Sequence, residues 1–281
     1  MPSSPDFQHR DLRNHSFVAQ PLIGADFRGA DLRGCDFRRA ILTQARFEGC
    51  RLGQTRRQRG VWLLAMVGAG GLVANALVRL IFAAIGQTPG EKAWNYVLVL
   101  YGFLALASLF MVPALLSRQR RLQRGGEVGA GAAIGALTGF FYGGYLTANN
   151  SLIAILTAIG VGVLGGLFCL LNQTGTRSLL LLTTGTITTY AFSFFIGARA
   201  LALLVTAHWW AGSAWGIVAL GALGLTFQGL KQIPARLGQA PGTLFRRAVL
   251  TGAQFAANNL SQADFRGAID PPPTLTNHSN P

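Results

Sequence analysis

The chain has 281 residues, of which 51% are hydrophobic and 12% charged, and its formal net charge is +14. This apolar content with so few charges argues against an ordinary soluble domain. It is typical of a multi-spanning membrane protein with a modest soluble part. Three cysteines do not make a disulfide framework, which argues against a small cross-linked secreted protein.

The N-terminal segment is built on a period of five residues. Every fifth residue is Phe or Leu, and the residue two places before each of these centres is small. A helix repeats its apolar residues every three or four positions and a strand every two, so this period fits neither. It predicts a solenoid whose units are stabilised by stacking on their neighbours. The centres are Phe27, Leu32, Phe37, Leu42, Phe47 and Leu52, and the small residues are Ala25, Ala30, Cys35, Ala40, Ala45 and Cys50.

The same period can be followed back towards the N-terminus. In this first stretch, Arg10, His15 and Gln20 replace the small residue. The assignment of a first coil therefore depends on the centres alone, which are Phe7, Leu12, Phe17 and Leu22.

A long apolar insert follows the first array. It is preceded by a basic segment, residues 51–60, which predicts a hinge. A membrane span needs about 20 apolar residues. On that basis we predict six spans, with the turn between the last two either at 197–199 or at 208–210. The predicted spans are residues 61–85, 93–116, 128–148, 151–171, 178–196 and 201–227.

Basic residues are concentrated on one side of this topology. Residues 1–60, the second loop, the fourth loop and the segment from residue 228 onwards hold 21 of the 24 basic residues, and only Arg79, Lys92 and Arg199 fall elsewhere. The positive-inside rule then places both arrays in the cytoplasm, as an even number of spans also requires. We expect an integral multi-pass protein with both termini cytoplasmic.

The third predicted span carries a glycine at every fourth position. Small residues at this spacing let helices approach closely, and we interpret them as packing within the chain, with a homo-oligomer seam as the alternative. These residues are Gly131, Gly135, Gly139 and Gly143. No Asp or Glu falls inside any predicted span. His208 adjoins two tryptophans, which indicates an interfacial aromatic belt rather than a pigment or metal ligand.

The five-residue period returns at the C-terminal end, after a linker that contains Pro234 and Pro241. Phe and Leu alternate as centres, and this second array begins on Phe, the type expected after Leu52. We therefore predict that the two arrays form one solenoid, interrupted by the apolar insert. The centres of the second array are Phe245, Leu250, Phe255, Leu260 and Phe265.

The A-(D/N)-(L/F)-x-x pattern resembles the pentapeptide-repeat family. The resemblance implies a right-handed, four-sided β-helix with twenty residues per coil, in which the centre and the small residue point inward. The expected fold is mixed: a six-helix transmembrane bundle inserted into a right-handed quadrilateral β-helix. The expected parts are an N-terminal β-helix (1–54), a basic hinge (55–60), the transmembrane domain (61–227), a linker (228–242), C-terminal coils (243–269) and a disordered tail (270–281).

Catalytic motifs are absent from the sequence: it has no Walker loop, no dinucleotide fingerprint after a strand, no GxSxG and no Cys/His pair at zinc spacing. We therefore expect no enzymatic activity, no cofactor and no metal. The outward flanks of the repeats predict a docking surface at Arg28, Arg33 and Arg38. Residues 1–60 hold eleven arginines against six acids, which argues against mimicry of DNA, and we expect no nucleic acid partner.

The chain resembles membrane-anchored pentapeptide-repeat proteins, which are especially abundant in cyanobacteria, so the resemblance implies a plasma or thylakoid membrane. The repeat motif carries the resemblance over residues 7–54 and 243–269, and the six spans share only the general arrangement. We expect a non-enzymatic scaffold whose cytoplasmic β-helix docks a protein partner or a membrane complex. Net charge +14 also suggests contact with anionic lipid headgroups. The alternative is a lipid, glycolipid or small-solute transporter with regulatory repeats. A polar, charged cavity between the spans would favour transport, and a dry, glycine-packed bundle the scaffold.

Overall fold

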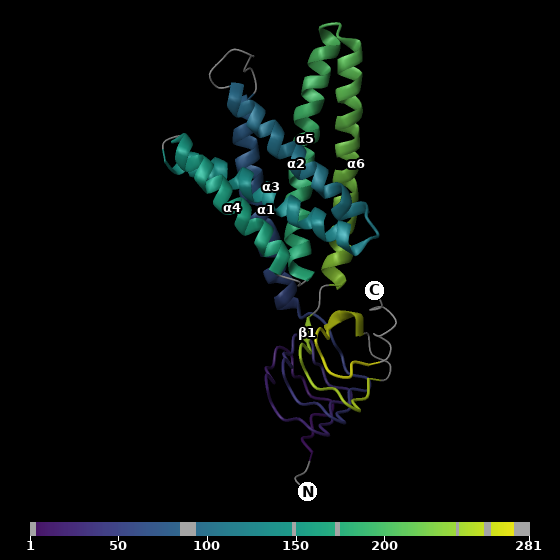
Figure 1. Cartoon of the computed structure of the whole chain (residues 1–281). Helices are drawn as coiled ribbons and strands as arrows, with labels where there is room; N and C mark the ends of the chain where they lie inside the picture. Colours follow the sequence, from purple (N-terminus) through teal and green to yellow (C-terminus); the bar gives the residue numbers. More distant parts are fainter. Residues whose placement is uncertain are drawn as a thin grey trace. The chain divides into compact units, whose positions relative to one another are not determined.

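A computed structural model of the chain describes residues 4–84, 94–147, 150–171, 175–239, 242–255 and 260–272. The chain divides into two compact units (Figure 1). The repeat unit comprises Met1–Leu63 and Leu237–Pro281, and the helical unit comprises Leu64–Arg236. Most of the predicted tail, residues 273–281, lies outside the described residues.

The repeat unit is a stack of coils in which residues twenty apart lie side by side. Isolated parallel bridges join Asp6 to Asp26 and Asp26 to Arg46, and the same spacing recurs at the other pentapeptide positions. Regular strand within the described residues is limited to β1 (Thr243–Leu244) and β2 (Ala263–Asp264), which pair in parallel. So little sheet does not confirm the predicted β-helix.

Phenylalanine rings fill much of the core of the stack in two columns. In the Phe7 column, rings 7, 27, 47 and 255 stack with centroids 4.9, 5.1 and 4.7 Å apart. In the Phe17 column, rings 17, 37, 245 and 265 stack at 5.0, 5.0 and 4.9 Å. Rings of different columns meet edge to face, as Phe27 and Phe37 do at 5.5 Å.

The predicted core residues all belong to this cluster. Phe255 and Phe265 are partly buried. The buried members are Phe27, Leu32, Phe37, Leu42, Phe47, Leu52, Phe245, Leu250 and Leu260.

The two arrays meet within one stack. Phe245 stacks on Phe37. A centre that follows Leu52 by one pentapeptide would lie twenty residues after Phe37 and would therefore stack on it. Phe245 takes that place, so the predicted continuation is confirmed. The backbone agrees, because Leu244 donates to the carbonyl of Cys35 at 3.0 Å and its own carbonyl accepts from Phe37 N–H at 2.7 Å. In Figure 1, the yellow C-terminal coils accordingly lie against the blue end of the N-terminal array.

The first coil is present from Asp6 onwards, although its small residues are replaced. Phe7 donates its N–H to the carbonyl of Asp26 at 2.8 Å. The three large polar residues at the small positions are exposed, because this coil has a described neighbour on one side only. They are Arg10, His15 and Gln20.

In the part of the chain that the structure describes, the helical unit is made mainly of six helices that follow the long apolar runs. Large apolar side chains face outward on them; Leu64 is 74% exposed and Leu171 75%. The helices are α1 (Arg56–Ala84), α2 (Trp94–Leu116), α3 (Arg120–Leu146), α4 (Ser151–Leu171), α5 (Gly175–Val205) and α6 (Trp209–Gln239).

Five of these six helices are long and apolar enough to cross a membrane: α1, α2, α4, α5 and α6. The prediction of six spans is therefore supported for five of them, since α3 does not reach that apolarity. The physical reason is its glycines, which add little apolar surface, together with the basic residues and the glutamate of its first turns.

Two predicted boundaries differ from the structure, which also selects between the two predicted places of the last turn. The basic hinge is the first turn of α1, where Thr55 and Gln58 form a capping box: Thr55 Oγ1 accepts from Gln58 N–H and Gln58 Oε1 from Thr55 N–H, at 3.3 and 3.2 Å. The predicted linker is mostly helix, because α6 runs through Pro234 to Gln239. The last turn lies at the later of the two predicted places, between Val205 and Trp209.

Candidate functional site

The residues that flank the repeat centres form ion pairs along the surface of the stack. Arg28 donates from Nε and Nη2 to the two carboxylate oxygens of Asp26, at 3.0 and 2.7 Å, and its backbone N–H also donates to Asp26 at 3.0 Å. Arg33 does the same to Asp31, and Arg38 pairs with Asp36 at 2.7 Å. The aspartate thus organises the turn and holds the arginine two residues later.

These pairs fix the charge of the carboxylates. Hydrogen bonds from the Arg28 side chain lower the pKa of Asp26, and those from Arg33 lower the pKa of Asp31. The pKa of Asp11 falls to about 2 through the hydrogen bonds of Arg13. All three carboxylates are ionised at neutral pH, so each cancels the charge of its arginine.

The structure does not bring the three predicted docking arginines together. Arg28, Arg33 and Arg38 flank three successive centres, whereas the bridges within the first array join residues twenty apart. Arg33 instead lies near Arg13 and Arg51. The bridges Asp11↔Asp31 and Asp31↔Arg51 place these three pentapeptides one above another on adjacent coils. The residues that share a surface are therefore one coil apart, not one pentapeptide apart.

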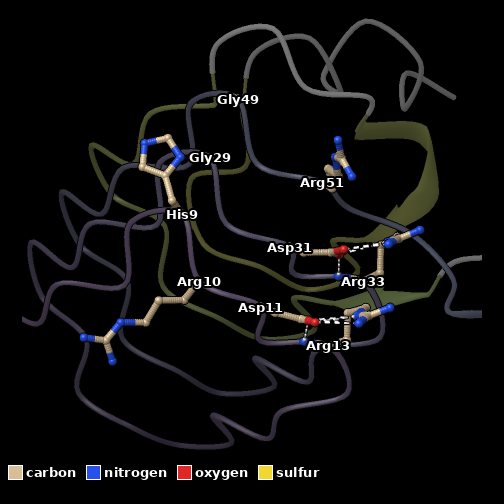
Figure 2. A pocket seen from close by; sticks show the side chains of 9 residues that line it. All are labelled: His9, Arg10, Asp11, Arg13, Gly29, Asp31, Arg33, Gly49 and Arg51. Atoms are coloured by element: carbon tan, nitrogen blue, oxygen red, sulfur yellow. Dashed lines mark hydrogen bonds and ion pairs between the residues drawn. The ribbon is translucent and has the colours of Figure 1, made fainter.

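This surface is a hollow of about 490 Å³, which we call the basic hollow (Figure 2). Two parallel ion pairs, Asp11–Arg13 and Asp31–Arg33, lie along one edge, and His9 lies at the opposite corner beside two glycine turns. Its lining holds four arginines against two aspartates. The lining residues are His9, Arg10, Asp11, Arg13, Gly29, Asp31, Arg33, Gly49 and Arg51.

Arg10 and Arg51 give the basic hollow its net charge. Both are exposed, and neither forms an ion pair with any carboxylate in the described part of the chain. Arg51 occupies the position that aspartate holds in the two preceding coils, so the sign of the charge reverses along this column. Sequence reasoning missed Arg51, although the substitution of Arg for Asp before a centre is visible in the repeats.

A glycine at the corner shapes the hollow. Gly29 has φ +67°, a conformation that side chains with a Cβ rarely adopt, and a Cβ there would clash with the imidazole of His9. His9 itself has φ +54°. The corner is therefore built by local backbone geometry that the five-residue pattern does not reveal.

In the helical unit, the predicted glycine stripe packs α3 against α4. A Cβ at Gly135 would lie 2.6 Å from the carbonyl oxygen of Val161, and one at Gly139 would clash with the carbonyl of Thr157. Gly131 similarly approaches Cys169, and Gly143 approaches the Thr157 side chain. All four predicted packing residues therefore contact one partner helix of the same chain.

One acidic residue lies inside a helix, immediately before the span predicted at 128–148. Glu127 lies inside α3, which begins eight residues before the predicted span, and it is only 5% exposed. Ser178 and Arg236 line the same small cavity, and Arg236 donates to Ser178 Oγ at 2.8 Å. Because four arginines lie between positions 118 and 124, the sequence predicts a loop where the structure has the first turns of α3.

The remaining candidate ligand, His208, contacts its own turn. Its Nδ1 lies 3.0 Å from the carbonyl oxygen of Thr206, and the adjoining Trp209 and Trp210 are exposed. Among the described residues, no group of three or more His, Cys, Asp or Glu side chains could hold a metal ion. Cys35 is buried and donates to the Leu12 carbonyl at 2.9 Å, and burial raises the pKa of its thiol to about 12.

Comparison with known proteins identifies the repeats. The family model of pentapeptide repeats matches residues 22–56 and 242–269, in 8 copies. These are both arrays without the first coil, whose small positions carry Arg10, His15 and Gln20. No curated protein and no solved structure matches the chain.

Proposed function

We propose that this pentapeptide-repeat chain is a non-enzymatic membrane scaffold whose repeat unit docks an acidic protein partner in the basic hollow. The observation that carries the proposal is the pair Arg10 and Arg51. Both cations are exposed in a concave surface without a described carboxylate partner, whereas the neighbouring Arg13 and Arg33 are paired. Complementary charge of this kind steers association and selects partners.

The repeat unit is proposed to be a right-handed, four-sided β-helix. Twenty-residue spacing of the parallel bridges supports four pentapeptides per coil. Two columns of Phe that meet edge to face, with Leu at the alternate positions, also fit a coil with four walls. Such a stack is rigid, which suits a docking surface whose charges must keep their spacing.

The membrane topology is proposed from the continuity of the stack. Because Phe37 and Phe245 stack, the apolar insert must begin and end on the same side of the membrane. An even number of crossings follows, so α3 crosses beside α4 despite its lower apolarity, with its glycines covered by that helix. The concentration of arginine in the arrays and around Arg118–Arg124 favours the cytoplasm for both termini.

The test compares Arg51 with a matched control. Arg46 sits in the same place of the neighbouring pentapeptide, is exposed, and is bridged to Asp26 as Arg51 is to Asp31, but it does not line the basic hollow. Native membranes carrying the wild type, Arg51→Gln or Arg46→Gln are extracted in mild detergent and sized on native gels. Co-migrating proteins are then identified by mass spectrometry.

We expect a defined complex for the wild type and for Arg46→Gln. Arg51→Gln should weaken it by about tenfold, the scale of one charge-assisted hydrogen bond, and Arg51→Lys should restore part of it. A lone particle for the wild type, or equal losses for both variants, would overturn docking in the basic hollow.

A further inference from the structure

The helical unit contains a second cavity, of about 390 Å³, formed by α1, α2, α3 and α4. We call it the α1–α4 cavity. Its lining is mostly aliphatic and aromatic. It includes Leu80, Ala83, Val97, Leu100, Phe140 and Tyr145, and Arg79 is the one cation among the described residues that line it. Ligand cavities of this size that are largely apolar with a few placed polar groups are the usual form of small-molecule sites.

Arg79 is held in place at this cavity. Its Nε donates to Asn75 Oδ1 at 3.2 Å, and its guanidinium carbon lies 5.5 Å from the centroid of the Tyr145 ring. Asn75 is itself fixed, because its Nδ2 donates to Tyr142 Oη at 3.0 Å and Tyr142 donates to the Leu72 carbonyl at 3.2 Å. No described carboxylate pairs with Arg79.

The guanidinium of Arg79, at the edge of an apolar cavity, would favour a bound ligand that carries a negative charge. Ionisable side chains in membrane-crossing helices are functional-site candidates by default, and an arginine near a helix end places its guanidinium at the interface, where anionic headgroups lie. Arg79 lies near the end of α1, a helix apolar enough to cross a membrane, and Tyr96 and Tyr145 line the same cavity. Arg and Tyr are residues that contact lipid headgroups, while the aliphatic lining matches a hydrocarbon chain.

We propose that the α1–α4 cavity binds an anionic amphiphile, with its acyl chain among Leu80, Val97 and Leu100 and its anionic head on Arg79. This inference depends on the membrane placement in the proposed function, but not on docking in the basic hollow. An anionic phospholipid and a free fatty acid offer the same chemistry to the site. The hydrogen bonds of Asn75 and Tyr142 position the guanidinium of Arg79, and neither of these two residues lines the cavity that would hold the acyl chain.

The experiment uses the purified full chain in detergent, with lipid removed. Palmitoyl-oleoyl phosphatidylglycerol, the zwitterionic phosphatidylcholine with the same chains, and oleate are added separately, and bound lipid is counted by native mass spectrometry. Arg79→Gln removes the charge and Arg79→Lys keeps it. Ala83→Phe fills the cavity from an exposed position of α1.

Two control variants match these changes. Arg199→Gln removes an exposed arginine from α5, and Val78→Phe adds a ring at an exposed position of α1; neither residue lines the cavity. Thermal melting of each variant checks that the helical unit remains folded. Because the protein is alone in the assay, failure of partner docking leaves the readout unaffected.

We expect wild type to retain phosphatidylglycerol in preference to phosphatidylcholine. Arg79→Gln should abolish the preference, a loss of about tenfold for one charge-assisted contact, and Ala83→Phe should reduce binding of both lipids. Retention of oleate but not phosphatidylglycerol would assign a free fatty acid as the ligand. Equal binding of the two phospholipids, or no response to Arg79→Gln and Ala83→Phe beyond that of the controls, would overturn the proposal.

Discussion

The two units of this chain hold their cores together in opposite ways. In the repeat unit, the close contacts are between large side chains: Phe37 is fully buried and stacks on rings of both arrays, at 5.0 Å on either side. In the helical unit, α3 and α4 approach through the absence of side chains, since a Cβ at Gly135 would lie 2.6 Å from a carbonyl oxygen. Deletion of side-chain volume should harm the first unit and addition should harm the second.

The largest effect is expected from Phe37→Ala. It leaves a cavity at the junction of the two arrays and should cost the repeat unit about 3–5 kcal/mol. Phe7→Ala is the matched control, because Phe7 lies in the terminal coil, is only partly buried and stacks on one ring of its column. Thermal unfolding of the full chain in detergent, with proteolysis of the repeats as readout, measures both. Equal losses of stability in Phe37→Ala and Phe7→Ala would contradict a stack in which Phe37 is covered by rings of both arrays.

A smaller loss is expected from Asp264→Asn. The carboxylate of Asp264 is almost fully buried and accepts from Arg246 at 2.7 Å and Arg266 at 2.5 Å. Burial alone would raise the pKa of Asp264, but the hydrogen bonds from Arg266 and Arg246 outweigh it, and the pKa is lowered. Loss of the charge at pH 7 should cost about 1.5–3 kcal/mol, as for hydrogen bonds to charged groups.

The pH dependence of this pair has a definite sign. Because the folded-state pKa of Asp264 lies below its unfolded value, the pair stabilises the repeat unit above the unfolded pKa, about 3.9. That stability is lost as pH falls through the folded pKa. At pH values below about 4, the melting temperature of the wild type should therefore fall more steeply with decreasing pH than that of Asp264→Asn. Parallel pH profiles would show that the pair does not contribute.

The smallest effect is expected in the helical unit, from Gly135→Ala. One methyl group would force α3 from α4 and should cost about 1–3 kcal/mol, as overpacking does. Gly160→Ala, on α4, is the matched control, because a Cβ there meets no atom within 4 Å. Thermal melting of the helical unit should separate the two variants. If Gly160→Ala were the more damaging, the packing of α3 on α4 would be wrong.

The sequence was informative where one physical rule governs many residues. The period of five predicts which residues face the core of the repeat unit, and the alternation of Phe and Leu predicts that Phe245 follows Leu52; its stacking on Phe37 confirms this. The number and approximate place of the helices follow from apolar runs. Glycines every fourth residue predicted the face of α3 that packs on a neighbour, though not which neighbour.

Features that depend on a single contact were not predictable in this way. Thr55 and Gln58 match a capping box, yet the arginines around them suggested a hinge. Glu127 was placed outside the span because hydropathy alone could not show that α3 begins at Arg120. The basic hollow depends on which residues lie one coil apart. Arg13 and Arg33 line it beside Arg51. Arg28 and Arg38 form the same kind of Asp–Arg pair but flank other columns of the stack.

The most direct test of the account is a disulfide between the arrays. Ile41 and Val249 are bridge partners on adjacent coils, while Ile269 lies one coil beyond Val249. In a chain whose three native cysteines are replaced by alanine, Ile41→Cys is combined with Val249→Cys or with Ile269→Cys. A protease site between α4 and α5 lets the two arrays run as separate fragments unless a disulfide joins them. Cα atoms on adjacent coils lie within disulfide range and those two coils apart do not.

The account predicts that oxidation of intact membranes joins the fragments in the Ile41→Cys/Val249→Cys chain and leaves them separate in the Ile41→Cys/Ile269→Cys chain. Failure of the first pair to join, or equal joining of both, would contradict a single stack built from the two ends of the chain.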